Sequence, residues 1–173
     1  SPPRAPLPKP PKINLKQDVV KNNEFDINKT NANNWQKSIL SHALIGEKKA
    51  FERLEFFIKN GLKNYKEGRN FPSLDNVSRL APNFHFGEIS PNKVWYTVVN
   101  NKQNENTDHF LSELGWREFS NHLLYHFPQF IYENLQKKFD GFPWKNDGIA
   151  LKKWQKGLTG FPLVDAGMRE LWQ

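Results

Sequence analysis

The stretch Glu113-Leu114-Gly115-Trp116-Arg117-Glu118-Phe119 places two carboxylates, a guanidinium and an indole inside a segment with the pattern of a buried helix. A helix that is apolar on nearly all sides is typical of a protein core, and charges in a core are costly unless they are paired or functional. Two interpretations stay open. An internal Glu–Arg pair could hold helices in register, or Glu113, Trp116 and Arg117 could line a cavity that receives a flat, partly polar ligand.

Length and composition restrict the classes of function. A chain of 173 residues can bury one core, so we expect one domain or part of a larger one. The chain has no cysteine, which excludes disulfides, thiolate metal sites and thiol nucleophiles. Its formal net charge of +7 favours a polyanionic partner, although Lys-rich solvated helices give the same charge. No stretch has the apolar pattern of a membrane span or a signal peptide, so we expect a cytoplasmic protein with no membrane partner.

Both ends of the chain carry unusual sequence. The chain begins with Ser1 and a Pro-rich run at 2–11, which favours polyproline structure and is typical of an inter-domain linker. We assign residues 1–34 to a linker and polar segment and residues 35–173 to a helical domain. Residues 170–173 lie inside an apolar helical pattern with no stop signal, so we expect a fragment truncated within its domain.

Apolar residues at spacings of three and four predict an all-α class, and no alternation typical of strands persists. Pro72 biases the preceding residue away from helix and ends one predicted helix near Gly68. Thr107 or Asp108 is expected to cap the long helix. The predicted helices are 35–44, 47–68, a segment begun by Ser90-Pro91, 110–126, 150–156 and 162–173.

A short polar loop, Asp75-Asn76-Val77-Ser78-Arg79-Leu80-Ala81-Pro82, separates two predicted helices. Loops of this kind can present successive backbone N–H groups to phosphate oxygens, aided by a hydroxyl and an arginine. An ordinary capped loop would have the same composition, so both interpretations stay open.

Histidine and tryptophan residues elsewhere raise further hypotheses. His122 and His126 stand four apart on one helix, a spacing that can chelate zinc. No third ligand is indicated and aliphatic neighbours favour packed imidazoles, so we expect no metal site. No nucleophile-elbow motif supports Ser/His/Asp hydrolysis. Trp144, in Phe142-Pro143-Trp144-Lys145, is either the anchor of a loop or a redox-active ring.

Four blocks between residues 35 and 173 are the strongest indication of function. They are Tyr65-Lys66-Glu67-Gly68-Arg69-Asn70-Phe71-Pro72, Ser78-Arg79-Leu80-Ala81-Pro82 with Phe86-Gly87-Glu88-Ile89-Ser90-Pro91, the 113–119 stretch, and Phe142-Pro143-Trp144 with Trp154-Gln155-Lys156-Gly157 and Thr159-Gly160-Phe161-Pro162-Leu163-Val164-Asp165-Ala166-Gly167-Met168-Arg169. In this order and spacing they resemble the N-terminal part of the helical FAD-binding domain of the DNA photolyase/cryptochrome family. Residues 120–128 are more similar to bacterial class I cyclobutane pyrimidine dimer photolyases than to animal cryptochromes.

The resemblance implies a deoxyribodipyrimidine photo-lyase, a carbon–carbon lyase that repairs cyclobutane pyrimidine dimers in ultraviolet-damaged DNA. In the family the dimer is flipped out of the duplex, and light drives an electron from reduced FAD to the dimer, which splits. A cryptochrome-like photoreceptor without repair activity is one alternative, and a basic nucleic-acid-binding module without cofactor is another. We expect a monomer with an unspecified antenna chromophore. The fragment alone should be inactive and bind FAD weakly, because family segments that hold the flavin ring follow Gln173 in full-length relatives.

The same resemblance implies the residues that hold the cofactor. Val77 and Ala81 stand where the family commonly has Thr and Ser, which removes two hydroxyl contacts but leaves the backbone N–H donors. The expected FAD contacts are Tyr65, Phe110, Arg117 and the loop residues Val77, Ser78, Arg79, Leu80 and Ala81, which match the loop around the phosphates and ribityl chain.

It also implies the residues that act on DNA and on the electron. Arg69 matches a DNA-phosphate contact, and Arg117 and Ser120 are expected to help hold DNA. Glu113 resembles the carboxyl group that hydrogen-bonds a dimer base and steadies its radical anion. Trp116 resembles the indole against which the flipped dimer packs. Trp144 matches the solvent-side member of the tryptophan chain that photoreduces the flavin. The expected catalytic residues are therefore Glu113, Trp116 and Trp144.

Overall fold

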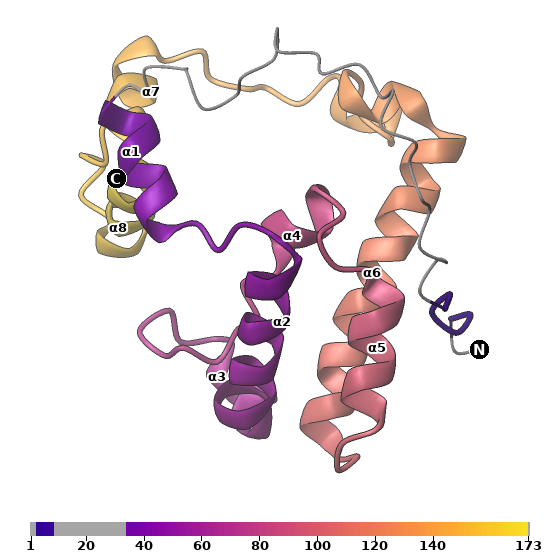
Figure 1. Cartoon of the computed structure of the whole chain (residues 1–173). Helices are drawn as coiled ribbons and strands as arrows, with labels where there is room; N and C mark the ends of the chain where they lie inside the picture. The colour runs from indigo at the N-terminus through magenta and orange to yellow at the C-terminus, as the bar shows by residue number, and fades with distance from the viewer. Residues whose placement is uncertain (1–2, 9–33, 173) are drawn as a thin grey trace, which may run out of the picture. The chain divides into compact units, whose positions relative to one another are not determined.

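The computed structural model describes residues 3–8 and 34–172, and the chain falls into two compact units. Unit 1 comprises Ser1–Ile27 and Leu44–Pro128, and unit 2 comprises Asn28–Ala43 and Gln129–Gln173. All regular structure in the described residues is helical, which confirms the predicted all-α class (Figure 1). Most of the predicted linker, residues 9–33, lies outside the described residues. Of the helices described, none combines the length and the apolar character needed to cross a membrane.

The helix predicted at 47–68 forms, but its hydrogen-bonding pattern changes three times along its length. Such changes mark local strain or a functional segment, because π and 3₁₀ turns are less favourable than α turns. Its four parts are α2 (Glu47–Phe56), the π-helical η2 (Phe57–Gly61), the 3₁₀-helical η3 (Leu62–Asn64) and α3 (Tyr65–Gly68).

Close packing of Asn76 against this helix explains two of its glycines. A Cβ at Gly61 would lie 2.9 Å from the Phe57 ring and 3.2 Å from the Asn76 backbone. A Cβ at Gly68 would lie 2.4 Å from Nδ2 of Asn76. In the space that the glycines leave, Nδ2 of Asn76 donates to the carbonyls of Gly61 and Asn64, at 3.4 and 3.3 Å. The loop after α3 is therefore fastened directly to the irregular part of the helix.

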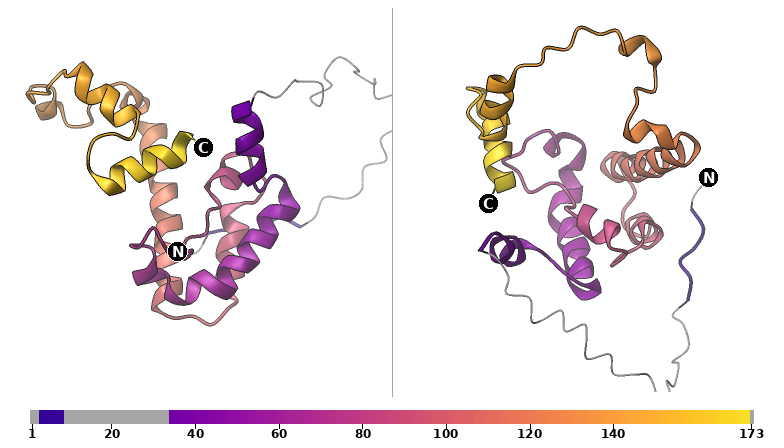
Figure 2. Two further views of the ribbon diagram at one scale, coloured as in Figure 1. Left: turned by 90° about the vertical axis from the view of Figure 1, so that its left-hand side faces the viewer. Right: turned by 90° about the horizontal axis from the view of Figure 1, so that it is seen from above.

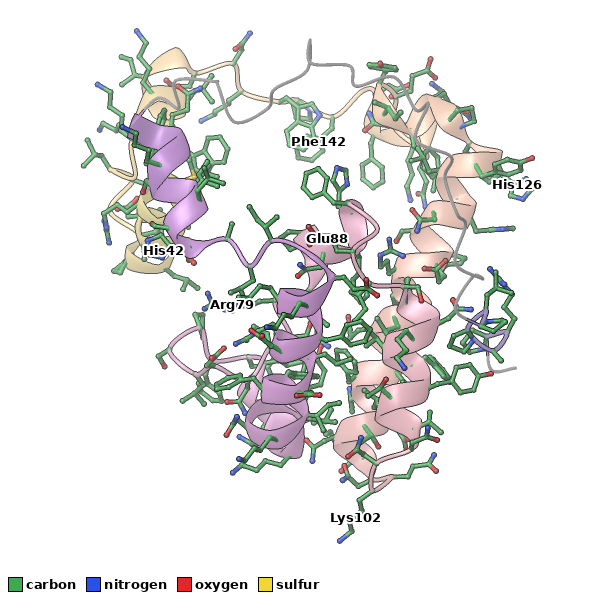
Figure 3. The ribbon with its side chains drawn as sticks, viewed as in Figure 1. His42, Arg79, Glu88, Lys102, His126 and Phe142 are labelled. Atoms are coloured by element: carbon green, nitrogen blue, oxygen red, sulfur yellow. The ribbon has the colours of Figure 1, made fainter. Side chains whose placement is uncertain are left out.

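The other helices of unit 1 are α4 (Ala81–His85), α5 (Pro91–Val99) and α6 (Glu105–His126). Ser90 caps α5 as predicted, since its hydroxyl oxygen accepts from the N–H of Lys93 at 3.1 Å. The chain then reverses through the turn that carries Lys102, and α6 runs back alongside α5 (Figure 3). The short helix α4 was not predicted, because its five residues are too few to show a period.

The predicted start and cap of α6 were wrong. The helix begins at Glu105 rather than Phe110, and Asn104 is its N-cap. Thr107 is the third helical residue, where its hydroxyl accepts from the N–H of Asn104 at 2.8 Å and completes a capping box. Polar residues before Phe110 concealed the first turn, because periodicity registers only apolar positions.

Aromatic packing joins α6 to the irregular helix. The Phe110 ring lies 4.8 Å from Phe57 and 5.3 Å from Tyr65, and the last contact is edge-to-face. Such pairs stabilise a core beyond the burial of their area. The buried apolar residues of unit 1 are Ala50, Leu54, Phe57, Leu62, Tyr65, Leu80, Ile89, Val94, Val98, Phe110, Leu111 and Leu114.

Only the first half of α6 is a core helix within the described residues. Its buried residues end at Leu114, whereas Trp116 is 62% exposed and Tyr125 is 82% exposed. The expectation of a helix buried on nearly all sides is therefore wrong for the second half. At 22 residues α6 spans about 33 Å, and α5, with nine, covers less than half of that length. The remainder of α6 continues beyond α5 (Figure 2).

Unit 2 contains α1 (Asn34–His42), η5 (Lys137–Phe139), α7 (Gly148–Gln155) and α8 (Pro162–Trp172), and η4 (Pro128–Ile131) begins at the boundary between the units. Three of these confirm predicted helices, and the two 3₁₀ turns were missed. Between α7 and α8, the Asp165 carboxylate accepts from Thr159, through N–H and hydroxyl at 2.8 and 2.7 Å, and from the N–H of Gly160 at 3.0 Å. These bonds hold the pKa of Asp165 below its ordinary value.

We expect Gly61→Ala to lower the free energy of unfolding by about 1–3 kcal/mol, because its Cβ would overpack against Phe57 and the Asn76 backbone. Gly115→Ala is the matched control, since a Cβ there meets nothing within 4 Å. The control should raise the free energy of unfolding by up to about 1 kcal/mol through helix propensity. Urea unfolding followed by far-ultraviolet circular dichroism measures both, and equal effects would contradict the close contact.

Candidate functional site

Four of the predicted site residues occupy one face of α6. Glu113, Trp116, Arg117 and Ser120 follow the spacing i, i+3, i+4, i+7, which places them on a single stripe. We call these four residues the α6 face. The Ser120 hydroxyl donates to the Trp116 carbonyl at 2.9 Å, so it is held against the helix. The Trp116 ring stands edge-on to Phe119, with centroids 5.8 Å apart.

An Arg–Glu pair does link two helices at this face, but Glu113 pairs with Arg69 rather than with its helical neighbour Arg117. Both side chains of the pair are about one-third exposed. The hydrogen bond to Glu113 raises the pKa of Arg69 above its ordinary value. Because Arg69 directly follows α3, the pair ties α3 to α6. A pair this exposed contributes roughly 0–1 kcal/mol, so it is too weak to be the main support of the fold.

Arg117 has a different environment. Its guanidinium pairs with Glu118 and lies 5.3 Å from the centre of the Phe84 ring of α4. The α6 face therefore carries one indole, one carboxylate and the guanidinium of Arg117, and the guanidinium of Arg69 lies beside it through the pair with Glu113. This set can stack on a flat base and contact phosphate oxygens.

The predicted cavity is not closed by the described residues. Two hollows in the described chain are lined by other residues, one along 145–152 in unit 2 and one between 4–8, 47–51 and 87–93 in unit 1. Trp116 instead stands on an open face, where 62% of its surface is exposed. Among the described residues the α6 face is therefore accessible, and the predicted cavity stays a prediction.

Tyr65 and Phe110, both predicted flavin contacts, lie beneath this face. They are 6% and 3% exposed, and the Arg69 guanidinium lies 5.4 Å from the centre of the Tyr65 ring. Burial raises the pKa of the Tyr65 phenol; the Arg69 charge opposes this shift, and the Glu113 charge adds to it. The two rings position Arg69 and α6 from below, and direct contact with a cofactor stays a prediction for both.

The loop after α3 is shaped by a residue that sequence reasoning missed, Arg53 of α2. Its Nε donates to the carbonyl of Ser78 at 2.9 Å and its Nη2 to the carbonyl of Val77 at 2.8 Å. Nη1 and Nη2 also reach the Asp75 carboxylate, at 3.3 and 2.8 Å, and this bonding lowers the pKa of Asp75. We call residues 75–81 the 75–81 loop.

These contacts determine where the N–H groups of the loop point. In a trans peptide the C=O and N–H point in opposite directions, and the described chain has no cis bond. Because the carbonyls of Val77 and Ser78 face Arg53, the N–H groups of Ser78 and Arg79 face away from it. No described residue accepts a hydrogen bond from either group. Arg79 is left-handed, at φ 53°, the backbone state of anion-binding nests.

The side chains of the loop divide between anchoring and exposure. Leu80 is fully buried in the core, and Ala81 is the first residue of α4. The Ser78 hydroxyl lies 3.5 Å from the N–H of Leu80. The Arg79 side chain is 60% exposed at the outer edge of the loop (Figure 3) and lies 3.8 Å from Asp75. Two outward N–H groups beside an exposed guanidinium fit the phosphate group of a cofactor.

Trp144 belongs to unit 2. It is 73% exposed, and its ring is tilted against Phe142 at 4.5 Å. Both hypotheses for Trp144, that it anchors a loop and that it carries an electron, stay predictions. The His122 and His126 rings lie 4.3 Å apart, and the described residues contain no cluster of three metal-ligating side chains.

Comparison with known proteins gives consistent matches. The family described as the FAD binding domain of DNA photolyase matches residues 110–173. A deoxyribodipyrimidine photo-lyase of Agrobacterium fabrum is 42% identical over 142 residues, which are 80% of this chain and 30% of that protein. The chain thus spans about a third of the length of such relatives.

Two solved structures resemble the fold. A bacterial class III photolyase from Agrobacterium tumefaciens superposes with a TM-score of 0.75 at 42% identity, covering 80% of this chain and 30% of that one. A cryptochrome of Synechocystis gives 0.66 at 30% identity, covering 76% and 29%. The first match does not confirm the class I subtype expected from the sequence, because that relative is class III.

Stability measurements separate a structural from a functional role for Glu113. We expect Glu113→Gln to lower the free energy of unfolding by less than about 1 kcal/mol, as for a partly exposed pair. Phe110→Ala should lower it by about 3–5 kcal/mol, because it empties the centre of the aromatic cluster. Urea denaturation of both variants is the measurement. If the two losses were equal, Glu113 would be a structural residue of the core.

Proposed function

Because the chain belongs to the DNA photolyase/cryptochrome family, we propose that the protein carrying it is a deoxyribodipyrimidine photo-lyase, which uses light and FAD to repair cyclobutane pyrimidine dimers in ultraviolet-damaged DNA. The observation that carries the proposal is the α6 face, which presents Glu113, Trp116, Arg117 and Ser120 on one exposed stripe. The proposal includes a cytoplasmic monomer that needs no metal ion.

The α6 face supports binding of an extruded pyrimidine pair. An exposed indole offers a stacking surface that accepts any base, worth roughly 1–3 kcal/mol per base. Arg69 and Arg117 lie beside it and supply the charge that attracts the DNA backbone. Arg69 is weakly held, since its pair with Glu113 is partly exposed. DNA phosphate can therefore replace Glu113 as its partner, which releases the carboxyl group to hydrogen-bond a base.

The 75–81 loop supports binding of FAD. Its N–H groups at Ser78 and Arg79 are free to donate to phosphate oxygens, and the Arg79 guanidinium can pair with the same charge. When bound and reduced, FAD supplies the electron that opens the cyclobutane ring. The chain's own part is to bind the phosphates at this loop, to orient the dimer on Trp116 and to bring the Glu113 carboxyl group within hydrogen-bonding distance of the dimer.

A cryptochrome-like photoreceptor without repair activity is the second candidate. It is supported by the similarity to the Synechocystis cryptochrome. The two candidates differ at the α6 face, because a sensor that does not bind lesions has no need of an exposed indole beside a carboxylate. Repair is therefore the better supported function.

The deciding experiment uses the full-length protein. Purified protein with FAD is mixed with ultraviolet-irradiated oligothymidylate and illuminated with blue light, and the remaining dimers are counted by chromatography. Loss of dimers that requires light supports repair. Retained FAD that is photoreduced without any loss of dimers would favour the photoreceptor.

Glu113→Gln should leave dimer binding nearly unchanged and lower the yield of repair per absorbed photon, because the amide keeps the size and hydrogen-bonding shape of the side chain but lacks the ionisable carboxyl group. The full-length variant is compared with wild type in the illumination assay and in a DNA-binding titration. Equal repair yields for the two proteins would remove Glu113 from the chemistry.

Trp116→Ala should weaken binding of dimer-containing DNA by roughly 1–3 kcal/mol and leave binding of undamaged DNA unchanged. Tyr125→Ala is the matched control, because Tyr125 is also exposed but lies nine residues further on, on the opposite face of α6. Fluorescence titration with damaged and undamaged duplexes measures the difference. Unchanged discrimination in Trp116→Ala would rule out the stacking role.

A further inference from the structure

Two side chains hold the 75–81 loop in place, Arg53 of α2 and Asn76 of the loop itself. We propose that Arg53 and Asn76 are positioning residues: Arg53 keeps the Val77 and Ser78 carbonyls turned inward, and Asn76 fastens the loop to the irregular helix, so that the loop offers a preformed binding site for the phosphates of FAD. This inference rests on the proposed function, since it concerns the same cofactor.

Arg53 makes the larger contribution. Its side chain is only 10% exposed, and all three of its nitrogens bond to acceptors of the loop. The planar guanidinium reaches two backbone carbonyls and the Asp75 carboxylate at once, which a lysine ammonium on a flexible stem cannot do. The Asp75 carboxylate neutralises part of the Arg53 charge and fixes the orientation of the guanidinium group.

Asn76 provides the second attachment. Its amide fills the space left by Gly68 and donates to two carbonyls of the irregular helix, while its backbone packs against Gly61. Phe57, in the π-helical part of that helix, packs against both Tyr65 and Phe110. The loop and the α6 face are therefore both attached to the irregular helix, which fixes their positions relative to each other.

The proposed phosphate site is therefore formed by backbone N–H groups rather than by side chains. Residues 77 and 81 are Val and Ala, which offer no hydroxyl to an anion. The donors that remain are N–H groups, and their direction depends on the carbonyls that Arg53 holds. Fixing donors before a ligand arrives increases affinity, because less conformational freedom is lost on binding.

The test compares Arg53→Met, Arg53→Lys and Asn76→Ala in the full-length protein. Lys49→Met is the matched control, since Lys49 lies on α2 and its ion pair in the described part of the chain is with Glu52 at the surface. FAD affinity is measured by fluorescence titration of apoprotein. Loop opening is measured without FAD, as the rate of trypsin cleavage after the exposed Arg79, relative to cleavage after Lys102 in the α5–α6 turn.

We expect Arg53→Met and Arg53→Lys to weaken FAD binding by about 10- to 100-fold, as for loss of hydrogen bonds to a charged group. Asn76→Ala should show a smaller loss in the same direction. All three should raise cleavage after Arg79 relative to Lys102, whereas Lys49→Met should change neither quantity.

Wild-type affinity in Arg53→Lys would overturn the inference, because charge alone would then suffice. Unchanged cleavage after Arg79 in the Arg53 variants would overturn it as well. If wild-type protein failed to retain FAD while the variants still opened the loop, the proposed function would fail and the mechanical role of Arg53 would stand.

Discussion

The packing of Phe110 between Phe57 and Tyr65 is the contact on which the candidate site depends. It joins α6 to the irregular helix that precedes the 75–81 loop, and these segments carry most of the residues with predicted roles. Aromatic rings in tilted or edge-to-face contact have a defined geometry, so they fix orientation as well as distance. Because Phe110 is one turn before Glu113 on α6, the direction of the whole α6 face follows from this cluster.

The change of helix type at η2 and η3 links this core to the loop. Neither Gly61 nor Gly68 has room for a side chain of its own: the Phe57 ring and the Asn76 backbone fill the space at Gly61, and the Asn76 side chain fills it at Gly68. Glycine in a helix interior costs about 1 kcal/mol relative to alanine. That cost is offset by the close approach of the loop, whose backbone then meets Arg53. The irregular hydrogen bonding of this helix thus helps to fix the backbone N–H groups of the 75–81 loop.

The pair between Arg69 and Glu113 gives the α6 face a resting state. Each partner has a predicted role toward DNA, yet in the free chain each satisfies the other. A partly exposed pair contributes little free energy, so breaking it would carry no large penalty. In the described residues both charges of this pair are therefore partly solvated and matched to each other.

The sequence by itself determined the helical class, most helix positions and the set of residues on the α6 face, because apolar spacing and i, i+3, i+4 relations are local properties of a helix. It also led to the family through its ordered blocks. The tertiary structure decided which side chains become partners and which parts of each helix are buried, because local spacing does not encode either. Glu113 pairs with a residue 44 positions earlier, not with Arg117, and Arg53 reaches a loop more than 20 positions later. Within the described residues, the first half of α6 is buried and the second is exposed because the neighbouring helices cover only part of its length. Each of these outcomes depends on segments far apart in the chain meeting in space, and their packing selects one partner among several of suitable chemistry.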